Sequence, residues 1–192
     1  SRRQRQMCIR DSDGAALVEI YAPYVRDEAV SFEVEVPSAA EFSRRIETIS
    51  GQYPYLVYAV GDEIAGYAYA SKHRERAAYC YDADLSIYVS PKYHGTGVAQ
   101  KLYGCLLELL KALGYYNVYA ALTVPNEKSR RFHEKCGFSL IGSFHRTGYK
   151  FGRWYDVAWF EKAINHAEAP GPVRSISGLP DEELEEILKR YN

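Results

Sequence analysis

The sequence lacks any long apolar run. No stretch approaches the roughly 18 residues that a membrane-spanning helix needs, and the basic opening from Ser1 to Gln6 is not followed by the apolar core of a signal peptide. We therefore expect a cytoplasmic location and no membrane partner. Residues 1–8, which include the single methionine Met7, are expected to be a leader or a flexible N-terminus outside the fold.

The sequence also lacks an excess of positive charge and any clustering of cysteine. Its 24 Lys and Arg balance 25 Asp and Glu, whereas nucleic acid and anionic membrane surfaces are bound through an excess of cationic side chains. The four cysteines stand far apart, without a Cys-x-x-Cys pair or a histidine at ligand spacing. The charge balance predicts no nucleic-acid partner. The spacing of the cysteines predicts no zinc or other metal site, and it indicates a reducing compartment.

What remains is an ordinary globular composition, with 192 residues of which 47% are hydrophobic. The length fits one domain, which we place at residues 9–165. Residues 166–192 begin with a Pro-Gly-Pro linker and continue into a short amphipathic helix, with acidic residues at its start and basic residues at its end. We expect this helix to dock on the domain; a contact in a dimer is the alternative.

Hydrophobic periodicity predicts the order of elements along the domain. Helices are expected at 14–25, 39–50, 98–113 and 126–136, and strands at 55–60, 64–70, 82–89, 117–123, 138–145 and 155–160. Antiparallel strands come first, and a β-loop-α-β-α-β run follows. The predicted fold class is therefore a mixed α+β domain with one sheet and helices on both of its faces.

One loop joins the strand at 82–89 to the helix at 98–113, and it contains Gly95 and Gly97. A glycine-containing loop that leads into a helix directs several unpaired backbone N–H groups at one point, where the helix dipole is positive. Such a point binds phosphate oxygens. A tight turn without a ligand is the simpler interpretation of two glycines alone.

Two familiar phosphate motifs do not fit this loop. The P-loop ends in Gly-Lys-Ser/Thr, whereas Gly97 is followed by Val98 and Ala99. The dinucleotide fingerprint requires a third glycine where Gln100 stands. The residues therefore indicate a phosphate site without identifying the ligand.

At this loop the chain resembles the GNAT superfamily of acetyl-CoA-dependent N-acetyltransferases. The family loop Gln/Arg-x-x-Gly-x-Gly/Ala matches His94, Gly97 and Ala99, with His94 departing from the usual residue. The segment from Asn126 to Phe138 is similar to a second family segment, an Asn-led helix that ends in Gly-Phe. The resemblance implies a mostly antiparallel sheet whose strands splay apart at the acetyl-CoA site.

Further segments narrow the resemblance to the phosphinothricin acetyltransferase branch. They are Ala29–Glu33, Tyr88–Pro91, His133 in place of the more common tyrosine, and Gly148–Val157. The resemblance implies acetylation of the α-amine of small amino acids such as phosphinothricin and methionine sulfoximine, and it implies a homodimer.

The resemblance also implies a binding site for acetyl-CoA, the co-substrate. The strand backbone at Ile87, Tyr88 and Val89 is expected to pair with the pantetheine amides. The loop is expected to bind the diphosphate, and the start of the next helix is expected to contact the pantetheine arm. The residues concerned are His94, Gly95, Thr96, Gly97, Val98 and Ala99 in the loop, and Asn126 and Ser129 on the helix. Asn126 is in any case the expected helix cap.

Acetyl transfer needs a neutral amine, so a base has to remove a proton. Asp84 is the first candidate, because it aligns with the catalytic glutamate of the branch; a solvated surface carboxylate is the alternative. His133 is the second proton-handling candidate, as base or acid, although a lone histidine on a helix is more often structural. Tyr88 is expected to donate to the thioester carbonyl.

Three residues are expected to bind the acceptor. Arg74 and Arg76 project to one side of an extended chain and suit a carboxylate or phosphinate, and Phe32 is an apolar wall beside the substrate side chain. A charged surface loop is the alternative for the arginines.

The predicted function is direct acetyl transfer from acetyl-CoA to a small amino acid or analogue. A polyamine, antibiotic or peptide N-terminus is the alternative acceptor, and a non-catalytic acyl-CoA sensor is the alternative class.

Overall fold

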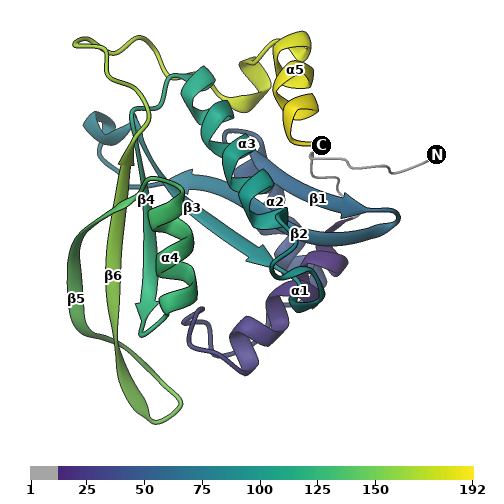
Figure 1. Ribbon diagram of the computed structural model, residues 1–192, viewed down its shortest axis with the longest axis vertical. Helices are drawn as coiled ribbons and strands as arrows, with labels where there is room; N and C mark the ends of the chain where they lie inside the picture. Colours follow the sequence, from purple (N-terminus) through teal and green to yellow (C-terminus); the bar gives the residue numbers. More distant parts are fainter. Residues whose placement is uncertain (1–12) are drawn as a thin grey trace.

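The computed structural model describes residues 13–192, so the expectations for residues 1–8 and for the first residues of the domain lie outside the described part. The helices are α1 (Gly14–Arg26), α2 (Ala39–Ser50), α3 (Val98–Leu113), α4 (Glu127–Lys135) and α5 (Asp181–Tyr191). The strands are β1 (Tyr55–Val60), β2 (Glu63–Lys72), β3 (Asp82–Val89), β4 (Asn117–Val124), β5 (Ser139–Lys150) and β6 (Arg153–Ala163). Figure 1 shows this order along the chain.

The six strands form one sheet in the order β1-β2-β3-β4-β6-β5. All neighbouring pairs are antiparallel except β3 and β4, which run parallel. These two strands are paired only from Asp82 opposite Asn117 to Asp84 opposite Tyr119. Beyond this point β3 pairs with β2 alone and β4 with β6 alone, so the sheet opens as a wedge toward Val89 and Val124. The mixed, splayed sheet predicted from the sequence is confirmed.

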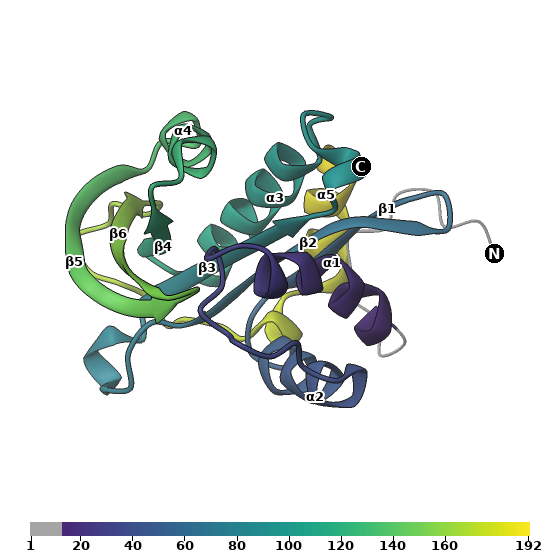
Figure 2. The ribbon, with the colours of Figure 1, turned by 90° about the horizontal axis from the view of Figure 1, so that it is seen from below.

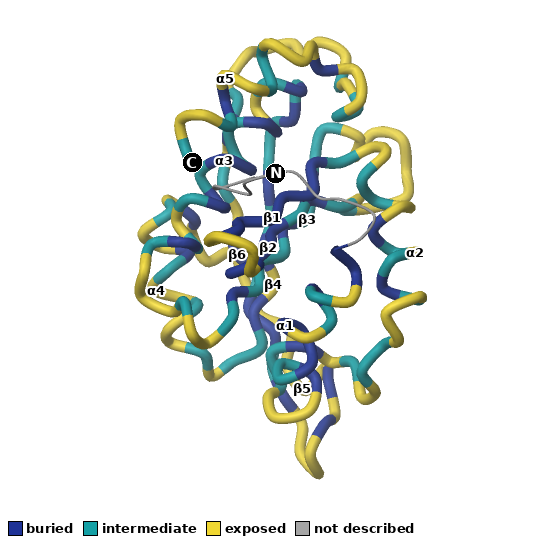
Figure 3. The backbone as a smooth tube through the Cα atoms, turned by 90° about the vertical axis from the view of Figure 1, so that its right-hand side faces the viewer, coloured by how far each residue is buried: buried dark blue, intermediate teal, exposed yellow. Residues whose placement is uncertain are grey.

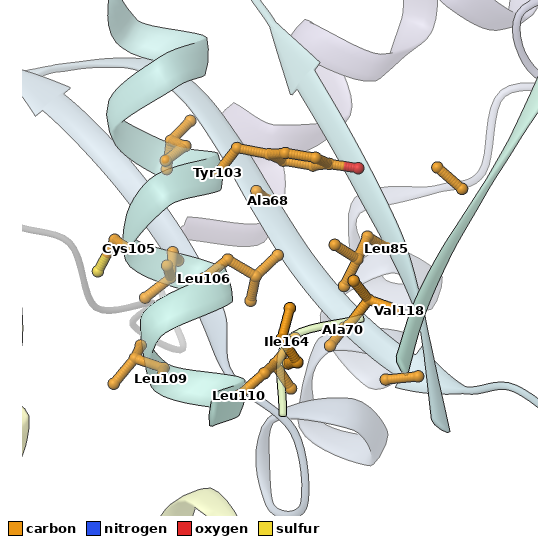
Figure 4. Packing of buried hydrophobic residues seen from close by; sticks show 14 of the residues in the cluster. Ala68, Ala70, Leu85, Tyr103, Cys105, Leu106, Leu109, Leu110, Val118 and Ile164 are labelled. Carbon is orange, nitrogen blue, oxygen red and sulfur yellow. The ribbon is translucent and has the colours of Figure 1, made fainter. Parts of the chain in front are cut away.

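Helices cover both faces of the sheet (Figure 2). On one face the leucines of α3 pack on alanines and valines of the strands, as Figure 4 shows. On the other face α1 and α2 pack on tyrosines of β1 and β2. Figure 3 shows the buried residues concentrated in the central strands and many exposed residues on the outer turns. Burial of a leucine stabilises the fold by roughly 1.5–3 kcal/mol, so this two-sided core holds the wedge in place.

The helix α3 begins and ends where the sequence predicts. Gly97 is the N-cap and Gly114 the C-cap, with φ values of 89° and 94°. Both lie in the left-handed region, which glycine adopts without the steric cost of a Cβ atom. The glycine in the loop therefore fixes where the first free N–H groups of α3 stand.

The β5–β6 hairpin is longer than the sequence predicts. The expected strands end at 145 and resume at 155, whereas the structure continues both strands to a two-residue turn at Phe151 and Gly152. Both turn residues have positive φ, 52° and 74°, as in a type I′ hairpin turn. The outward side chains of this hairpin are exposed and aromatic, so they do not give the alternation of apolar and polar residues by which a strand is recognised.

The C-terminal helix α5 lies beside α3 (Figure 1). Ile187 is 3% exposed within the α3 core, and the Tyr191 hydroxyl donates to Glu108 at 2.8 Å. A Cβ atom on Gly104 of α3 would lie 2.6 Å from the Tyr191 ring. The absence of a side chain at Gly104 thus lets α5 approach α3 closely.

Within residues 13–192, none of the helices is long and apolar enough to cross a membrane. The same part of the chain contains no group of three or more His, Cys, Asp or Glu side chains arranged to hold a metal ion.

Candidate functional site

The glycine loop follows the end of β3, on the β3 side of the open end of the wedge. Gly95 and Gly97 both have positive φ, 77° and 89°, and no atom outside their chain neighbours lies within 4 Å of a Cβ built on either. Among the described residues, no acceptor receives the backbone N–H of Val98, Ala99 or Gln100. These N–H groups at a helix N-terminus are free to bind an anion, and a diphosphate fits such a cradle.

His94 links this loop to two other elements. Its Nε2 lies 3.0 Å from the Val89 carbonyl oxygen and its Nδ1 lies 2.8 Å from Lys128 Nζ on α4. Since Lys donates, Nδ1 accepts and the imidazole proton is on Nε2, which donates to Val89. The Tyr24 hydroxyl of α1 also donates to the Val89 oxygen, at 2.6 Å. The histidine that departs from the family pattern thus holds a cationic Lys128 beside the loop.

The predicted strand residues lie on the two sides of β3. Val89 faces the α3 core, and Ile87 packs partly buried against it. Tyr88 faces α1, where its ring packs against Tyr21 and Tyr24 with centroids 5.0 and 5.3 Å apart. Burial raises the pKa of Tyr88 well above its usual value. The alternation of residue types along β3 suggests that this face is polar. At Tyr88, however, the face is covered by α1.

Asp84 stands at the closed end of the wedge, where the β3–β4 pairing stops. Its Oδ1 lies 2.6 Å from Nδ1 of His73, which directly follows β2. Burial raises the pKa of the Asp84 carboxyl, and the hydrogen bond from His73 opposes that rise. No sequence pattern marks His73 as a site residue. His73 and Asp84 are 11 positions apart in the chain and belong to no common motif, and only the antiparallel register of β2 on β3 brings the two side chains together.

His133 is 2% exposed, on the side of α4 that faces α3. Its Nδ1 donates to the Ser129 carbonyl oxygen at 2.8 Å, and its Nε2 accepts from the Tyr103 hydroxyl at 2.9 Å. Burial lowers the pKa of His133. Because both nitrogens are engaged, this geometry favours a role in holding α4 against α3. Proton transfer by His133 stays a prediction.

Asn126 is the N-cap of α4, as predicted. Its Oδ1 accepts from the Ser129 backbone N–H at 3.1 Å. Both residues stand at the end of β4, across the wedge from the glycine loop on β3. This position suits a contact with the pantetheine arm, which stays a prediction for both side chains.

A cavity of about 320 Å³ adjoins the end of β4. Its walls come from residues 27–30, from the end of β4 and from the β5–β6 turn, where the Arg153 guanidinium lies 4.5 Å from the centre of the Tyr155 ring. Phe32 contacts the same hairpin, with its ring 6.3 Å from that of Tyr155. Arg153 was not among the residues selected from the sequence, although it lies in the Gly148–Val157 segment.

The predicted arginines do not line this cavity. Arg74 and Arg76 are exposed and follow His73 at the closed end of the wedge. The Arg74 guanidinium lies 5.6 Å from the centre of the Tyr79 ring. Burial raises the pKa of Asp84, and the charge of Arg74 is one of the causes that oppose this rise. The predicted acceptor residues therefore do not lie together. Arg74 follows His73, near Asp84, whereas Phe32 lies beside the β5–β6 hairpin.

A larger cavity of about 990 Å³ lies between the start of α1 and the β1–β2 turn. Its wall includes the carboxylates of Asp13, Glu19, Asp62 and Glu63. Four carboxylates repel a diphosphate. This cavity is therefore not a site for a phosphate ligand, despite its size.

The loop that carries Phe32 is fixed by a buried lysine. Lys150 of β5 is 6% exposed, and its Nζ donates to the carbonyl oxygens of Val25, Glu28 and Ser31 at 2.6, 2.8 and 2.7 Å.

We expect Lys150→Met to lower the free energy of unfolding by about 1–3 kcal/mol, because buried carbonyls lose their donor. The KM for the acceptor should rise as the loop loosens. Thermal unfolding measures the loss of stability, and steady-state kinetics measures the change in KM. An unchanged stability together with an unchanged KM would contradict this role of Lys150. Lys162→Met is the control, because it removes a single contact, to the Cys136 carbonyl oxygen.

Comparison with known proteins agrees with this geometry. The Acetyltransferase (GNAT) domain family matches residues 7–159. The phosphinothricin N-acetyltransferase of Streptomyces viridochromogenes is 32% identical over 168 residues, which are 88% of this chain and 92% of the relative. The L-methionine sulfoximine/L-methionine sulfone acetyltransferase of Salmonella typhimurium is 27% identical over 83% of this chain and 94% of the relative.

Among solved structures, a phosphinothricin acetyltransferase of Sinorhizobium meliloti in complex with acetyl-CoA matches with a TM-score of 0.82 and 33% identity, covering 88% of this chain and 93% of that one. We conclude that the chain belongs to the GNAT acetyltransferase family and is an acetyl-CoA-dependent N-acetyltransferase.

Proposed function

We propose that the protein transfers the acetyl group of acetyl-CoA to the α-amine of a small amino acid or analogue, of the phosphinothricin or methionine sulfoximine type. The observation that carries the proposal is the wedge between β3 and β4, which has a glycine loop with free helix N–H groups at its open end and the half-buried Asp84 carboxylate at its closed end. The names of the relatives support the class of acceptor.

Acetyl-CoA supplies an activated acetyl thioester. We propose that the loop from His94 to Ala99 binds its diphosphate through backbone N–H groups, with Lys128 adding charge. The backbone of Ile87, Tyr88 and Val89 would hold the pantetheine arm along the open edge of β3, since β4 has diverged there. Asn126 and Ser129 would hold it from the other side of the wedge.

Direct transfer within a ternary complex is favoured over an acetyl-cysteine intermediate. Of the described cysteines, Cys105 is buried in α3 and Cys80 is exposed beside the turn at Ala77–Tyr79. Cys136 caps the end of α4, and burial raises the pKa of its thiol. A nucleophilic cysteine requires a lowered thiol pKa, so Cys136 is a poor candidate.

The carboxylate of an α-amino acid lies two bonds from its amine. A cation that binds this carboxylate therefore has to stand close to the base, and Arg74 meets this condition because its charge acts on Asp84. We propose that Arg74 and Arg76 together bind the anionic groups of the acceptor, and that Phe32 contacts its side chain.

Arg76→Ala is expected to raise the KM for an α-amino acid by about tenfold, the effect of losing one charge-assisted hydrogen bond. The KM for the corresponding uncharged amino amide should not change. Steady-state kinetics on the two acceptors measures the difference. Arg153→Ala is the matched comparison, since it removes the same charge at the hairpin turn. A selective effect in Arg153→Ala and none in Arg76→Ala would contradict the assignment.

A thiol-release assay with a panel of acceptors tests the proposed function. The panel contains phosphinothricin, methionine sulfoximine, ordinary amino acids, a polyamine, an aminoglycoside and a peptide. We expect turnover with the small amino acids and analogues. Turnover confined to another amine would overturn the acceptor class, and stabilisation by CoA without turnover on any amine would indicate a sensor.

We further propose that the protein is a homodimer. The β5 edge of the sheet has no neighbouring strand among residues 13–192, and its hairpin exposes about half or more of each of several large apolar side chains, Leu140, Ile141, Phe144, Tyr149 and Trp154. Apolar groups gathered on one edge favour association. Sedimentation equilibrium measures the mass, and a monomer at micromolar concentration would contradict the proposal.

A further inference from the structure

The closed end of the wedge contains a histidine held on several sides. The His73 ring stacks on Tyr119 of β4, with centroids 4.3 Å apart and an interplanar angle of 17°. The rings of Tyr79 and Trp159 meet it edge-on, each with its centroid 6.3 Å away. The His73 side chain is 10% exposed. Its orientation is therefore set by packing, in addition to the hydrogen bond with Asp84.

That hydrogen bond fixes which nitrogen carries the proton. The contact between Nδ1 and the Asp84 carboxylate is 2.6 Å long, and an ionised carboxylate only accepts. The proton of the neutral imidazole is then on Nδ1, and the lone pair is on Nε2. Nε2 makes no hydrogen bond to the residues that the structure describes. It is the unengaged proton acceptor of the pair.

A second buried group near this ring also has no partner. The indole Nε1 of Trp159 is buried and donates to no described atom, although its ring borders His73. A buried donor without an acceptor is costly, and it is usually satisfied by water or a ligand. The unpaired indole N–H and the unengaged Nε2 thus point to a small polar group bound beside the His73 ring.

We propose that His73 is the general base of the acetyl transfer, and that Asp84 is the positioning residue that orients it and stabilises its protonated form. The inference rests on the proposed function and names the base within it. One of the two Asp84 carboxylate oxygens, Oδ1, is already bound by His73. Aspartate is also one methylene shorter than the glutamate of the family, so the imidazole extends the reach of the carboxylate.

In the proposed step, protons and electron pairs move between four groups: the acceptor amine, His73, the thioester and water. Nε2 of His73 takes one proton from the ammonium group of the acceptor, which frees the nitrogen lone pair. The nitrogen attacks the thioester carbon, the new C–N bond forms, and the C–S bond breaks with its electron pair on sulfur. The second proton of the nitrogen ends on the thiolate, and the imidazolium releases its proton to water. Asp84 stays ionised throughout.

The charges around the pair come from several elements. Asp84 and Asp82 lie on β3, Arg74 follows β2, and Glu161 of β6 acts on Tyr119 beside the ring. Lys72 and Glu75 are paired with each other in the same connection. The pair is therefore flanked by both signs of charge, and Asp84 is the one group within hydrogen-bond distance of the imidazole among the described residues.

The experiment replaces His73 by glycine and attempts to restore activity with added imidazole. In His73→Gly, kcat should fall by about 10²–10⁴-fold, the usual contribution of a general base. Imidazole in the buffer should then raise the kcat of this variant by about tenfold or more. Imidazole should restore nothing in Asp84→Asn. The double variant should be no slower than His73→Gly alone, because the two residues act as one unit.

Three further readings complete the test. The acidic limb of the kcat/KM pH profile should disappear in His73→Gly, and ¹⁵N NMR should find the His73 proton on Nδ1. Acetyl-CoA affinity by calorimetry should stay unchanged, which confirms that the variant is folded. His145→Phe is the control, since it disrupts a second His–Asp contact, between His145 Nδ1 and Asp156 at 3.1 Å, at a histidine that is 78% exposed.

The outcomes separate the inference from the function on which it rests. A wild-type protein that acetylates amino acids, with a His73→Gly variant slowed less than about threefold or not restored by imidazole, would overturn the inference and leave the function standing. A wild-type protein that acetylates none of the acceptors would overturn the function itself.

Discussion

Asp84→Asn is expected to lower kcat by about 10²–10⁴-fold, the contribution of general base catalysis, and to leave the affinity for acetyl-CoA nearly unchanged. The substitution keeps the shape of the side chain and removes its charge. The proton-accepting pair then has no anion to stabilise an imidazolium. We propose that acetyl-CoA is bound mainly at the other end of the wedge, by the loop before α3.

Stopped-flow or steady-state thiol release measures kcat, and calorimetry measures acetyl-CoA binding. Asp82→Asn is the matched control, because Asp82 lies on the same side of β3 two residues earlier and, among residues 13–192, its side chain accepts a hydrogen bond from Asn117 alone, at 3.3 Å. Equal losses in the two variants would indicate a general effect of charge at the end of β3, and an unchanged kcat in Asp84→Asn would remove Asp84 from the reaction.

The pH dependence of stability separates a catalytic role from a structural one. Burial raises the pKa of Asp84 in the folded protein, so the folded state binds its proton more tightly than the unfolded state does. This carboxyl therefore adds stability as the pH falls through its raised pKa, and it opposes folding above that pKa. At neutral pH the Asp84→Asn variant should be no less stable than the wild type, because the amide oxygen of Asn still accepts from His73 Nδ1 and the variant carries no charge to desolvate.

Gly97→Val is expected to weaken acetyl-CoA binding by about 10- to 100-fold. Gly97 has φ 89° and ψ −4°, a left-handed conformation at the N-cap of α3. A β-branched residue in that conformation costs of order 1–3 kcal/mol, and relaxation of the backbone turns the first N–H groups of α3 away from a common point. The space around Gly97 is open, so the effect comes from conformation and not from a clash.

Calorimetric titration with acetyl-CoA measures this loss. Gly51→Val is the control, since Gly51 also has open space around it but has φ −70°, which any residue adopts. The control should bind acetyl-CoA as the wild type does. Equal affinity in Gly97→Val and Gly51→Val would contradict the assignment of the diphosphate to this loop.

Much of the fold could be predicted because its signals are local. The leucine stripe of α3 and its two capping glycines set both ends of that helix, and alternation set β3 from Asp82 to Val89. The far half of the β5–β6 hairpin could not be predicted in this way. It pairs residues such as Gly148 with Tyr155 across a turn in which Phe151 takes a positive φ, and a phenylalanine does not signal such a turn.

The site residues also fall into two groups, those that lie in one chain segment and those that only the packing of the fold brings together. The loop glycines and Asp84 belong to one continuous segment, so their order along the chain indicated their relation. His73 reaches Asp84 only through the register of two strands, in which Lys72 pairs with Ala83. The burial of His133 depends on Tyr103 of α3, 30 residues away. Contacts of this kind arise from packing, and residue type at one position does not reveal them.

If the wedge is the site of acetyl transfer, the acetyl group of acetyl-CoA passes to the α-nitrogen of the acceptor. Mass spectrometry of methionine sulfoximine incubated with acetyl-CoA and the protein detects the product. We predict one acetyl group on the α-nitrogen for each free thiol formed. Thiol formation at the rate seen without acceptor, with the amino acid recovered unmodified, would contradict acetyl transfer.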